Sequence, residues 1–285
     1  MKYHINNKYF DFDSQAFIMG ILNITPDSFY DGGKHFCRDR AIEFAYQIVS
    51  EGADILDVGA ESTRPNSERI SYHEEMDRIV PVLKMLFESD FPIPISIDTY
   101  KPEVAEEACK IGVSIINDIS GTTYDNAIID IAKNHDAALI INHINGSIES
   151  MHTIDKEKNI IDEILLFFEE KISLCKSKNF TKIILDPGIG FGKTLYQNID
   201  IIKNIHVLKQ LNFPILIALS RKRFIGEVLD KSPSDRLSGT LAANAISIYN
   251  GANIIRVHDV KENVEVLKIS KSILNSHKFT NSNVN

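Results

Sequence analysis

The feature that most constrains the fold of this chain is an alternation of short apolar runs with segments of helical periodicity. Eight runs rich in β-branched and other apolar residues are bounded by turn residues: 17–22, 54–58, 94–98, 113–117, 137–142, 182–186, 214–220 and 253–258. Near-continuous apolar strands are typical of a parallel sheet covered on both faces. Eight strand–helix units within 285 residues therefore predict an α/β fold, a single-domain (β/α)8 TIM barrel rather than a doubly wound sheet.

The ends of the chain are predicted to lie outside the barrel repeat. Residues 1–16 predict a short hairpin that turns around Asn6 and Asn7 and closes the barrel floor. Residues 17–275 form the barrel domain, and the polar stretch 276–285 is expected to be a flexible tail. In the late helical segment, the spacing predicts a buried face made by Leu237, Leu241, Ala245 and Ile248.

Charge and composition argue against several classes of partner. A net charge of −8 is unlike the basic surface of proteins that bind nucleic-acid backbones. No apolar run approaches the length of a membrane span, and charges stand where a signal peptide needs an apolar stretch. The three cysteines lie far apart and form no CxxC pair, which indicates free thiols in a reducing compartment. We expect a cytoplasmic protein that binds neither nucleic acid nor membrane.

Polar side chains stand at the C-terminal ends of the predicted strands, where barrels of this type build their active sites. In chain order they are Asn23, Asp57 with Glu61, Asp98, Asn117 with Asp118, Asn142 with His143, Asp186, Lys222 just past Ser220, and Arg256 with His258. One or two of them would be ordinary helix caps. A complete ring indicates a binding site, although Asp57, Asn142 and His143 taken singly are equally well explained as caps or core hydrogen-bonding groups.

The types of charge in this ring indicate the ligand. Buried carboxylates at Asp98 and Asp186 need hydrogen-bond donors, which suits a flat heterocycle with an amidine-like N–H edge. Lys222, Arg256 and His258 follow the last two strands, where barrels often bind phosphate. The pattern favours one ligand that carries both a donor-rich ring and a phosphate-like anion.

The stretch GIGFGKT at 188–194 invites two other interpretations. A P-loop needs glycine at position 187, where this chain has Pro187, and the spacing also fails as a dinucleotide fingerprint. The glycines are better explained by close approach of the backbone to a planar ligand, with Phe191 or Lys193 covering it. No metal-ligand triplet is present in the sequence, but a Mg²⁺ ion brought by a diphosphate and touched by Asn23 fits the pattern.

Seven ordered motifs resemble those of the dihydropteroate synthase family. They read MGILNITPDSFYDGG, ILDVGAESTRP, ISIDTYKPEVA, IINDISG, ILDPGIGFGK, SRK and IIRVHDV. The resemblance implies a (β/α)8 barrel that condenses 7,8-dihydropterin-6-ylmethyl diphosphate with p-aminobenzoate and releases pyrophosphate in folate synthesis. It also implies a Mg²⁺ cofactor, membership of an enzyme family that sulfonamides target, and a homodimer.

The resemblance further assigns site residues. The pterin pocket falls on Asp98, Asn117, Asp186, Lys222, Phe191 and Arg256, of which Asp98, Lys222, Asp186 and Arg256 are expected to be catalytic. The diphosphate and its Mg²⁺ fall on Asn23, Thr63, Arg64, Arg256 and His258, with Asn23 as the metal ligand and Ser62 as a further neutral donor. Segment 23–34, with Gly32 and Gly33 as hinges, is expected to close with 59–69 over the aminobenzoate site.

The chain departs from the family pattern at a few positions. Ala60 and Asn66 replace glycines of the second loop, Asn142-His143-Ile144 replaces Met-His-Met, and Arg223 replaces a serine that receives the aminobenzoate carboxylate. Two alternatives are a methyltetrahydrofolate–corrinoid methyltransferase relative, against which TPDSF and SRK weigh, and a non-catalytic pterin-binding paralogue. The retained diphosphate residues argue against the paralogue.

Overall fold

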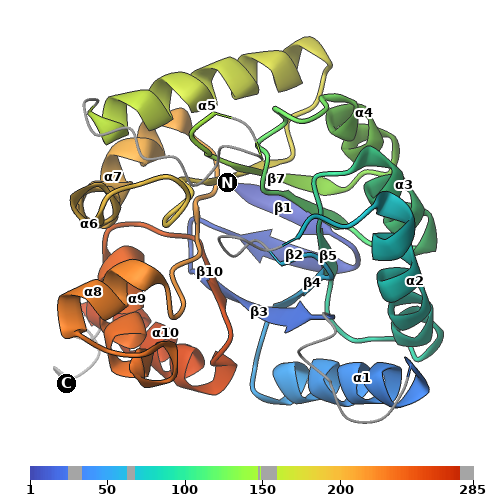
Figure 1. Ribbon diagram of the computed structural model, residues 1–285. Coiled ribbons are helices and arrows are strands. Elements are labelled where there is room, and N and C mark those ends of the chain that lie inside the picture. The colour runs from blue at the N-terminus through green and yellow to red at the C-terminus, as the bar shows by residue number, and fades with distance from the viewer. Residues whose placement is uncertain (25–33, 63–67, 147, 149–158, 277–285) are drawn as a thin grey trace, which may run out of the picture.

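The computed structural model describes residues 1–24, 34–62, 68–146, 148 and 159–276, without the side chains of 34–37. Within these residues, eight parallel strands form a barrel that a ring of helices surrounds (Figure 1). The barrel strands are β3 (Phe17–Asn23), β4 (Ile55–Gly59), β5 (Ile95–Asp98), β6 (Ile115–Asp118), β7 (Ala138–Asn142), β8 (Ile183–Asp186), β9 (Leu216–Ile217) and β10 (Ile254–Val257). Each overlaps one of the eight predicted runs, so the predicted TIM barrel is confirmed.

The strands pair in the order β8-β7-β6-β5-β4-β3-β10-β9, and a parallel bridge between Leu185 and Ile215 joins the two ends of this order. The helices are α1 (Lys34–Ser50), α2 (Tyr72–Glu88), α3 (Pro102–Ile111), α4 (Ala127–Asn134), α5 (Ile160–Ser177), α6 (Leu195–Lys203), α7 (Ile205–Leu208), α8 (Arg223–Leu229), α9 (Leu237–Tyr249) and α10 (Val260–Leu274). Two 3₁₀ turns, Lys209–Leu211 and Pro233–Asp235, complete the described elements. No helix of the described ranges is both long and apolar enough to cross a membrane.

The apolar strands are buried on both faces, which explains why their sequences do not alternate with polar residues. Met19, Ile140 and Ile254 belong to a cluster inside the barrel. Ile18 and Ile141 belong to the cluster between strands and helices, and each of these side chains is at most 1% exposed. Replacing one of them by alanine would leave a cavity at a typical cost of about 2–5 kcal/mol.

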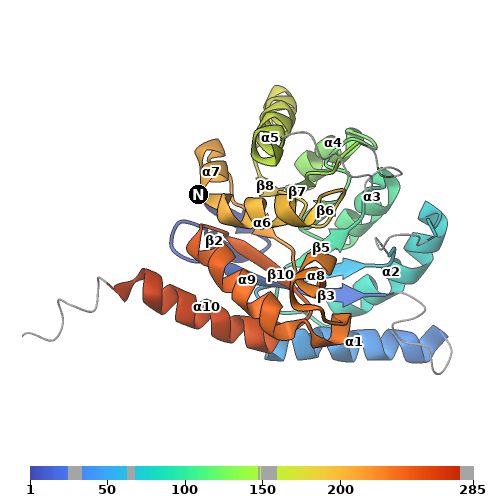
Figure 2. The same ribbon diagram turned by 60° about the vertical axis from the view of Figure 1, so that its left-hand side comes forward.

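The N-terminal hairpin covers the floor of the barrel, as predicted. β1 (Lys2–Ile5) and β2 (Lys8–Asp11) pair antiparallel around Asn6, whose φ of 46° is the left-handed conformation that asparagine adopts readily. Ile5, Phe10 and Phe12 pack into the cluster inside the barrel. Figure 2 shows the hairpin beside the starts of the strands, away from the ends where the polar residues gather. The domain boundaries at 16 and 275 stay predictions, and 277–285 lie outside the described residues.

The buried face of α9 differs from the predicted one. Its buried residues are Thr240, Asn244, Ser247 and Ile248, whereas Leu241 and Ala245 are only partly buried. Hydrogen bonds account for this rotation, because Asn244 Nδ2 donates to Asn263 Oδ1 of α10 at 2.7 Å and Thr240 Oγ1 accepts from the Arg221 amide at 3.0 Å. Polar side chains that find hydrogen-bond partners can be buried at a helix contact, so apolar spacing alone misplaced this face.

Candidate active site

The predicted polar residues meet at one end of the barrel because parallel strands all end there. Asp98 and Asn117 face each other in the register of β5 and β6, and Asp98 also pairs with Gly59 of β4. Asp186 ends β8 beside Asn142 of β7. The pairing places carboxylates and amides from adjacent strands at the same level of the barrel mouth.

Arg256 of β10 lies between two carboxylates at the centre of this mouth. Its Nε donates to Asp57 Oδ2 and its Nη2 donates to Asp98 Oδ2, both at 2.6 Å. Burial alone would lower the pKa of Arg256, but the charges of Asp57 and Asp98 raise it, so the guanidinium stays protonated. Burial raises the pKa of Asp98 to about 7 against the opposing charge of Arg256. The pair therefore consists of a charged guanidinium and a carboxyl group whose ionisation is disfavoured by burial.

Asp57 has a positioning role that the sequence left open. It is fully buried, and its Oδ2 accepts from Asn117 Nδ2 at 3.2 Å as well as from Arg256. Its Oδ1 has no hydrogen-bond partner in the described part of the chain. Asp57 thus orients both the guanidinium of Arg256 and the amide of Asn117. The sequence feature that points to this role is the position of Asp57 at the end of a predicted strand.

Asp186 and Lys222 form a second charged group on the opposite wall. Asp186 Oδ1 accepts from the Gly188 amide at 2.8 Å, and its pKa is raised by burial in spite of the nearby charge of Lys222. Burial lowers the pKa of Lys222 to about 8. The Lys222 ammonium donates to the Ile189 carbonyl and lies 4.7 Å from the centre of the Phe191 ring.

Lys193 holds the loop 188–193 and does not cover the pocket. Its buried Nζ donates to the carbonyls of His143 at 3.2 Å, Gly188 at 2.8 Å and Phe191 at 3.1 Å, which uses all three of its protons. Gly188 has a φ of 68°, and a Cβ there would lie 1.8 Å from the His143 carbonyl oxygen. The sequence predicted that either Phe191 or Lys193 covers a planar ligand, and Phe191 is the one whose side chain faces Lys222.

Asn23 and His258 border an open cavity of about 440 Å³ beside α1. Arg40, Glu43 and Gln47 of α1 line the same cavity. His258 is exposed, and its Nδ1 lies 3.1 Å from Ser220 Oγ. Among the described residues, no group of three or more histidine, cysteine or acidic side chains is arranged to hold a metal ion. The cavity combines the Arg40 guanidinium and amide groups with the Glu43 carboxylate, a mixed lining that suits a hydrated anion accompanied by a cation.

His143 is buried at the end of β7 and gives a pH prediction. Burial lowers its pKa to about 2, so the folded protein keeps it neutral while the unfolded chain takes up a proton below about pH 6.5. The unfolded state then binds more protons, so this contribution to stability is present above pH 6.5 and is lost as the pH falls. We expect the free energy of unfolding of the wild type, relative to His143→Gln, to fall by about 1.4 kcal/mol per pH unit between pH 6 and 4. Denaturant titrations of both proteins measure this difference, and a pH-independent difference would contradict it.

Several predicted residues lie outside the described part of the chain: Thr63, Arg64, Asn66, Gly32 and Gly33, with most of the two loops that carry them. Of the departures from the family pattern, Ala60 is buried and its carbonyl accepts from Arg78 Nη1 at 2.9 Å. Asn142 Nδ2 donates to the Ile119 carbonyl at 3.0 Å, which is a structural role. Arg223 begins α8 with its side chain 88% exposed and paired with Glu227.

Residues 19–258 match the family described as Pterin binding enzyme. The chain is 40% identical over 272 residues to a dihydropteroate synthase of Synechocystis sp., covering 94% of each. It is 40% identical over 265 residues to that of Escherichia coli, covering 92% of this chain and 93% of that protein. A solved dihydropteroate synthase from Clostridium difficile in the presence of pteroic acid has a TM-score of 0.87 and 43% identity, covering 93% and 98%. One from Xanthomonas albilineans with 4-aminobenzoic acid has a TM-score of 0.88 and 32% identity, covering 96% and 98%.

Proposed function

Because this chain belongs to the dihydropteroate synthases, the pterin-binding transferases of folate synthesis, we propose how its barrel mouth carries out their reaction. The substrates are 7,8-dihydropterin-6-ylmethyl diphosphate and p-aminobenzoate, and the products are dihydropteroate and pyrophosphate. The observation that carries the assignment of roles is the set of two negative and two positive side chains, Asp98, Arg256, Asp186 and Lys222, at the barrel mouth.

The dihydropterin ring binds between the two charged groups. Asp98 and Asp186 accept hydrogen bonds from the N–H groups of the ring, and Asn117 and Lys222 complement its remaining acceptors. Burial raises the pKa values of these two carboxyl groups because it removes the water that would solvate their charge. Hydrogen bonds from the ring therefore stabilise the charged form strongly. Phe191 covers one face of the ring beside the Lys222 ammonium.

The diphosphate leaves toward the exposed side of the mouth. The C–O bond between the methylene group and the diphosphate breaks, and Arg256 and His258 stabilise the negative charge that develops on the leaving oxygen. The positive charge left on the pterin methylene is stabilised by the nearby carboxylates. The amine of p-aminobenzoate then forms the new C–N bond and releases its proton to solvent, so no dedicated general base is required.

A Mg²⁺ ion fits the donor set beside the cavity. Asn23 ends β3 and offers an amide oxygen, a ligand type that Mg²⁺ accepts, while the diphosphate and water would supply the others. When bound, the ion neutralises charge on the diphosphate oxygens. Asn23 is the described residue that we propose to hold it, and Thr63 and Arg64 stay predicted partners of the diphosphate.

Arg223 stands where the family has a serine for the aminobenzoate carboxylate. Its guanidinium is exposed and pairs with Glu227 at 2.6 Å, so we infer that the carboxylate is received by the backbone at this position rather than by the side chain. We expect Arg223→Ser to change the KM for p-aminobenzoate by less than about fivefold, since an exposed ion pair contributes little. Steady-state kinetics with varied p-aminobenzoate measure this effect, and loss of turnover would contradict it.

We further propose a homodimer in the cytoplasm. The surface of α9 and α10 exposes Ile246, Tyr249, Ile269 and Ile273, each more than half exposed, and the two helices lie side by side (Figure 2). An exposed apolar surface of this kind is typical of an interface between subunits. The two described cysteines, Cys109 and Cys175, are free and buried, as expected in a reducing compartment.

The proposed function is tested by supplying the dihydropterin diphosphate and Mg²⁺ with and without p-aminobenzoate. Pyrophosphate release coupled one-to-one to dihydropteroate formation is the expected result. Tight binding of the pterin without turnover would instead identify a non-catalytic paralogue, and methyl transfer from methyltetrahydrofolate to a corrinoid would identify the other relative.

A further inference from the structure

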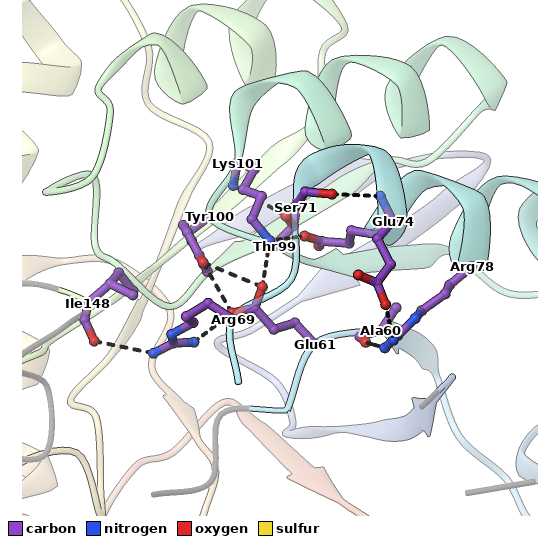
Figure 3. A network of polar contacts seen from close by, with 11 residues as sticks. Ala60, Glu61, Arg69, Ser71, Glu74, Arg78, Thr99, Tyr100, Lys101 and Ile148 are labelled. Atoms are coloured by element: carbon purple, nitrogen blue, oxygen red, sulfur yellow. Dashed lines mark hydrogen bonds and ion pairs between the residues drawn. The ribbon is translucent and has the colours of Figure 1, made fainter. Parts of the chain in front are cut away.

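A buried ion cluster joins the loops that follow β4 and β5 to the first turn of α2 (Figure 3). Lys101 Nζ donates to Glu61 Oε2 and to Glu75 Oε2, both at 2.5 Å. The three side chains are 7%, 5% and 1% exposed. The free energy of removing these charges from water offsets most of their mutual attraction, so the cluster contributes little net stability.

Glu61 is the common acceptor of this cluster. Besides Lys101, it accepts from Arg69 Nη1 at 2.6 Å and from the Tyr100 hydroxyl at 3.1 Å. Burial disfavours its charged form, yet the hydrogen bonds from Lys101 and Arg69 hold its pKa below the ordinary value. Glu61 is therefore ionised at neutral pH and fixes three side chains from two loops. By contrast, burial raises the pKa of Glu75 despite the contact with Lys101.

The residues that Glu61 fixes contact a buried apolar cluster, which forms a wall beside Phe191. Arg69 Nη2 donates to the Ile148 carbonyl at 3.2 Å, which ties the second loop to the loop after β7. The rings and side chains of Tyr100, Ile119, Ile144 and Ile148 form one buried cluster, and Phe191 packs against it. Phe191 is the residue that we propose to cover the pterin ring, and Ile119 follows the pocket residue Asn117 by two positions.

We propose that Glu61 is a positioning residue for the dihydropterin site, which it shapes by fixing Tyr100 and Ile148 in the wall that supports Phe191. The proposal rests on the pterin pocket described under the proposed function. Glu61 touches the wall and not the substrate, so its loss weakens the fit of the ring in the ground state and the transition state alike. Loss of such uniform binding raises KM and leaves kcat nearly unchanged.

Glu61→Gln is the variant that tests this role without unfolding the protein. Lys101 keeps Glu75 as its partner in this variant, so no buried ammonium is left unpaired. We expect the KM for the dihydropterin diphosphate, at saturating p-aminobenzoate, to rise about tenfold while kcat stays within about twofold. Tyr100→Phe keeps the ring in the wall and loses only the hydroxyl, so its KM should rise by less than about threefold.

Glu74→Gln is the matched control, because Glu74 lies on the same helix as Glu75 but is half exposed and forms an ion pair with Arg78. Its kinetics should equal those of the wild type. An unchanged KM in Glu61→Gln, or a loss of kcat without a change in KM, would overturn the proposal. Failure of the proposed function would look different, because the wild type itself would then form no dihydropteroate.

Discussion

Replacing Asp98 by asparagine should lower kcat/KM for the dihydropterin diphosphate by about a thousandfold. The carboxylate of Asp98 is only 14% exposed, accepts from Arg256 Nη2 at 2.6 Å, and is the proposed acceptor for the N–H edge of the ring. Hydrogen bonds to charged groups contribute about 1.5–3 kcal/mol each, and the variant loses the charge for two of them. A total of about 4 kcal/mol corresponds to the expected thousandfold effect.

Pyrophosphate release measured at several pterin concentrations gives this ratio directly. Asp136→Asn is the matched control, because its carboxyl is 90% exposed and pairs with Lys182 on the surface. The control should keep wild-type kinetics. If Asp98→Asn kept kcat/KM within about threefold of the wild type, Asp98 would not be the carboxylate that binds the N–H edge of the pterin ring.

Replacing Lys222 by methionine should lower kcat/KM by about a hundredfold and abolish the decline of kcat/KM at alkaline pH. Burial lowers the pKa of Lys222 to about 8, so the wild type loses this ammonium as the pH rises through 8. A missing charge-assisted hydrogen bond costs about 1.5–3 kcal/mol, which corresponds to the expected loss. The wild-type kcat/KM should therefore decline above pH 8, whereas the Lys222→Met variant should stay low and show no decline in that range.

The sign of the stability effect separates this decline from unfolding. Between about pH 8 and 10.5 the unfolded chain holds the Lys222 proton and the folded protein does not, so this group makes the free energy of unfolding rise with pH. Activity and this contribution to stability should thus move in opposite directions. Profiles of kcat/KM from pH 6 to 10 test the prediction, with Lys110→Met, a side chain 56% exposed on α3, as control. An alkaline decline that persists in Lys222→Met would contradict it.

The sequence predicted the barrel because its apolar runs are buried on both faces and are separated by helical spacing. It also placed Asp98, Asn117, Asp186, Lys222 and Arg256 together, because parallel strands end at the same edge of a sheet. These predictions depend on local patterns and on a topology that has few alternatives.

What the sequence could not predict are the partners that side chains choose within the site. The pairing of Arg256 with Asp57 joins residues 199 positions apart and depends on rotamers of β10 and β4. Lys193 faces three carbonyls rather than a ligand, which only the path of the 188–193 loop decides. The buried face of α9 also escaped prediction, because hydrogen bonds from Thr240 and Asn244 outweigh its apolar spacing.

The most direct test of the pocket is a calorimetric titration of the dihydropterin diphosphate, without p-aminobenzoate, into the wild type and the Asp98→Asn, Asp186→Asn and Asp136→Asn variants. We predict one binding site per chain in the wild type and in Asp136→Asn, and affinities at least about a hundredfold weaker in both pocket variants. Wild-type affinity in both Asp98→Asn and Asp186→Asn would contradict the assignment of the strand-end carboxylates as the pterin site.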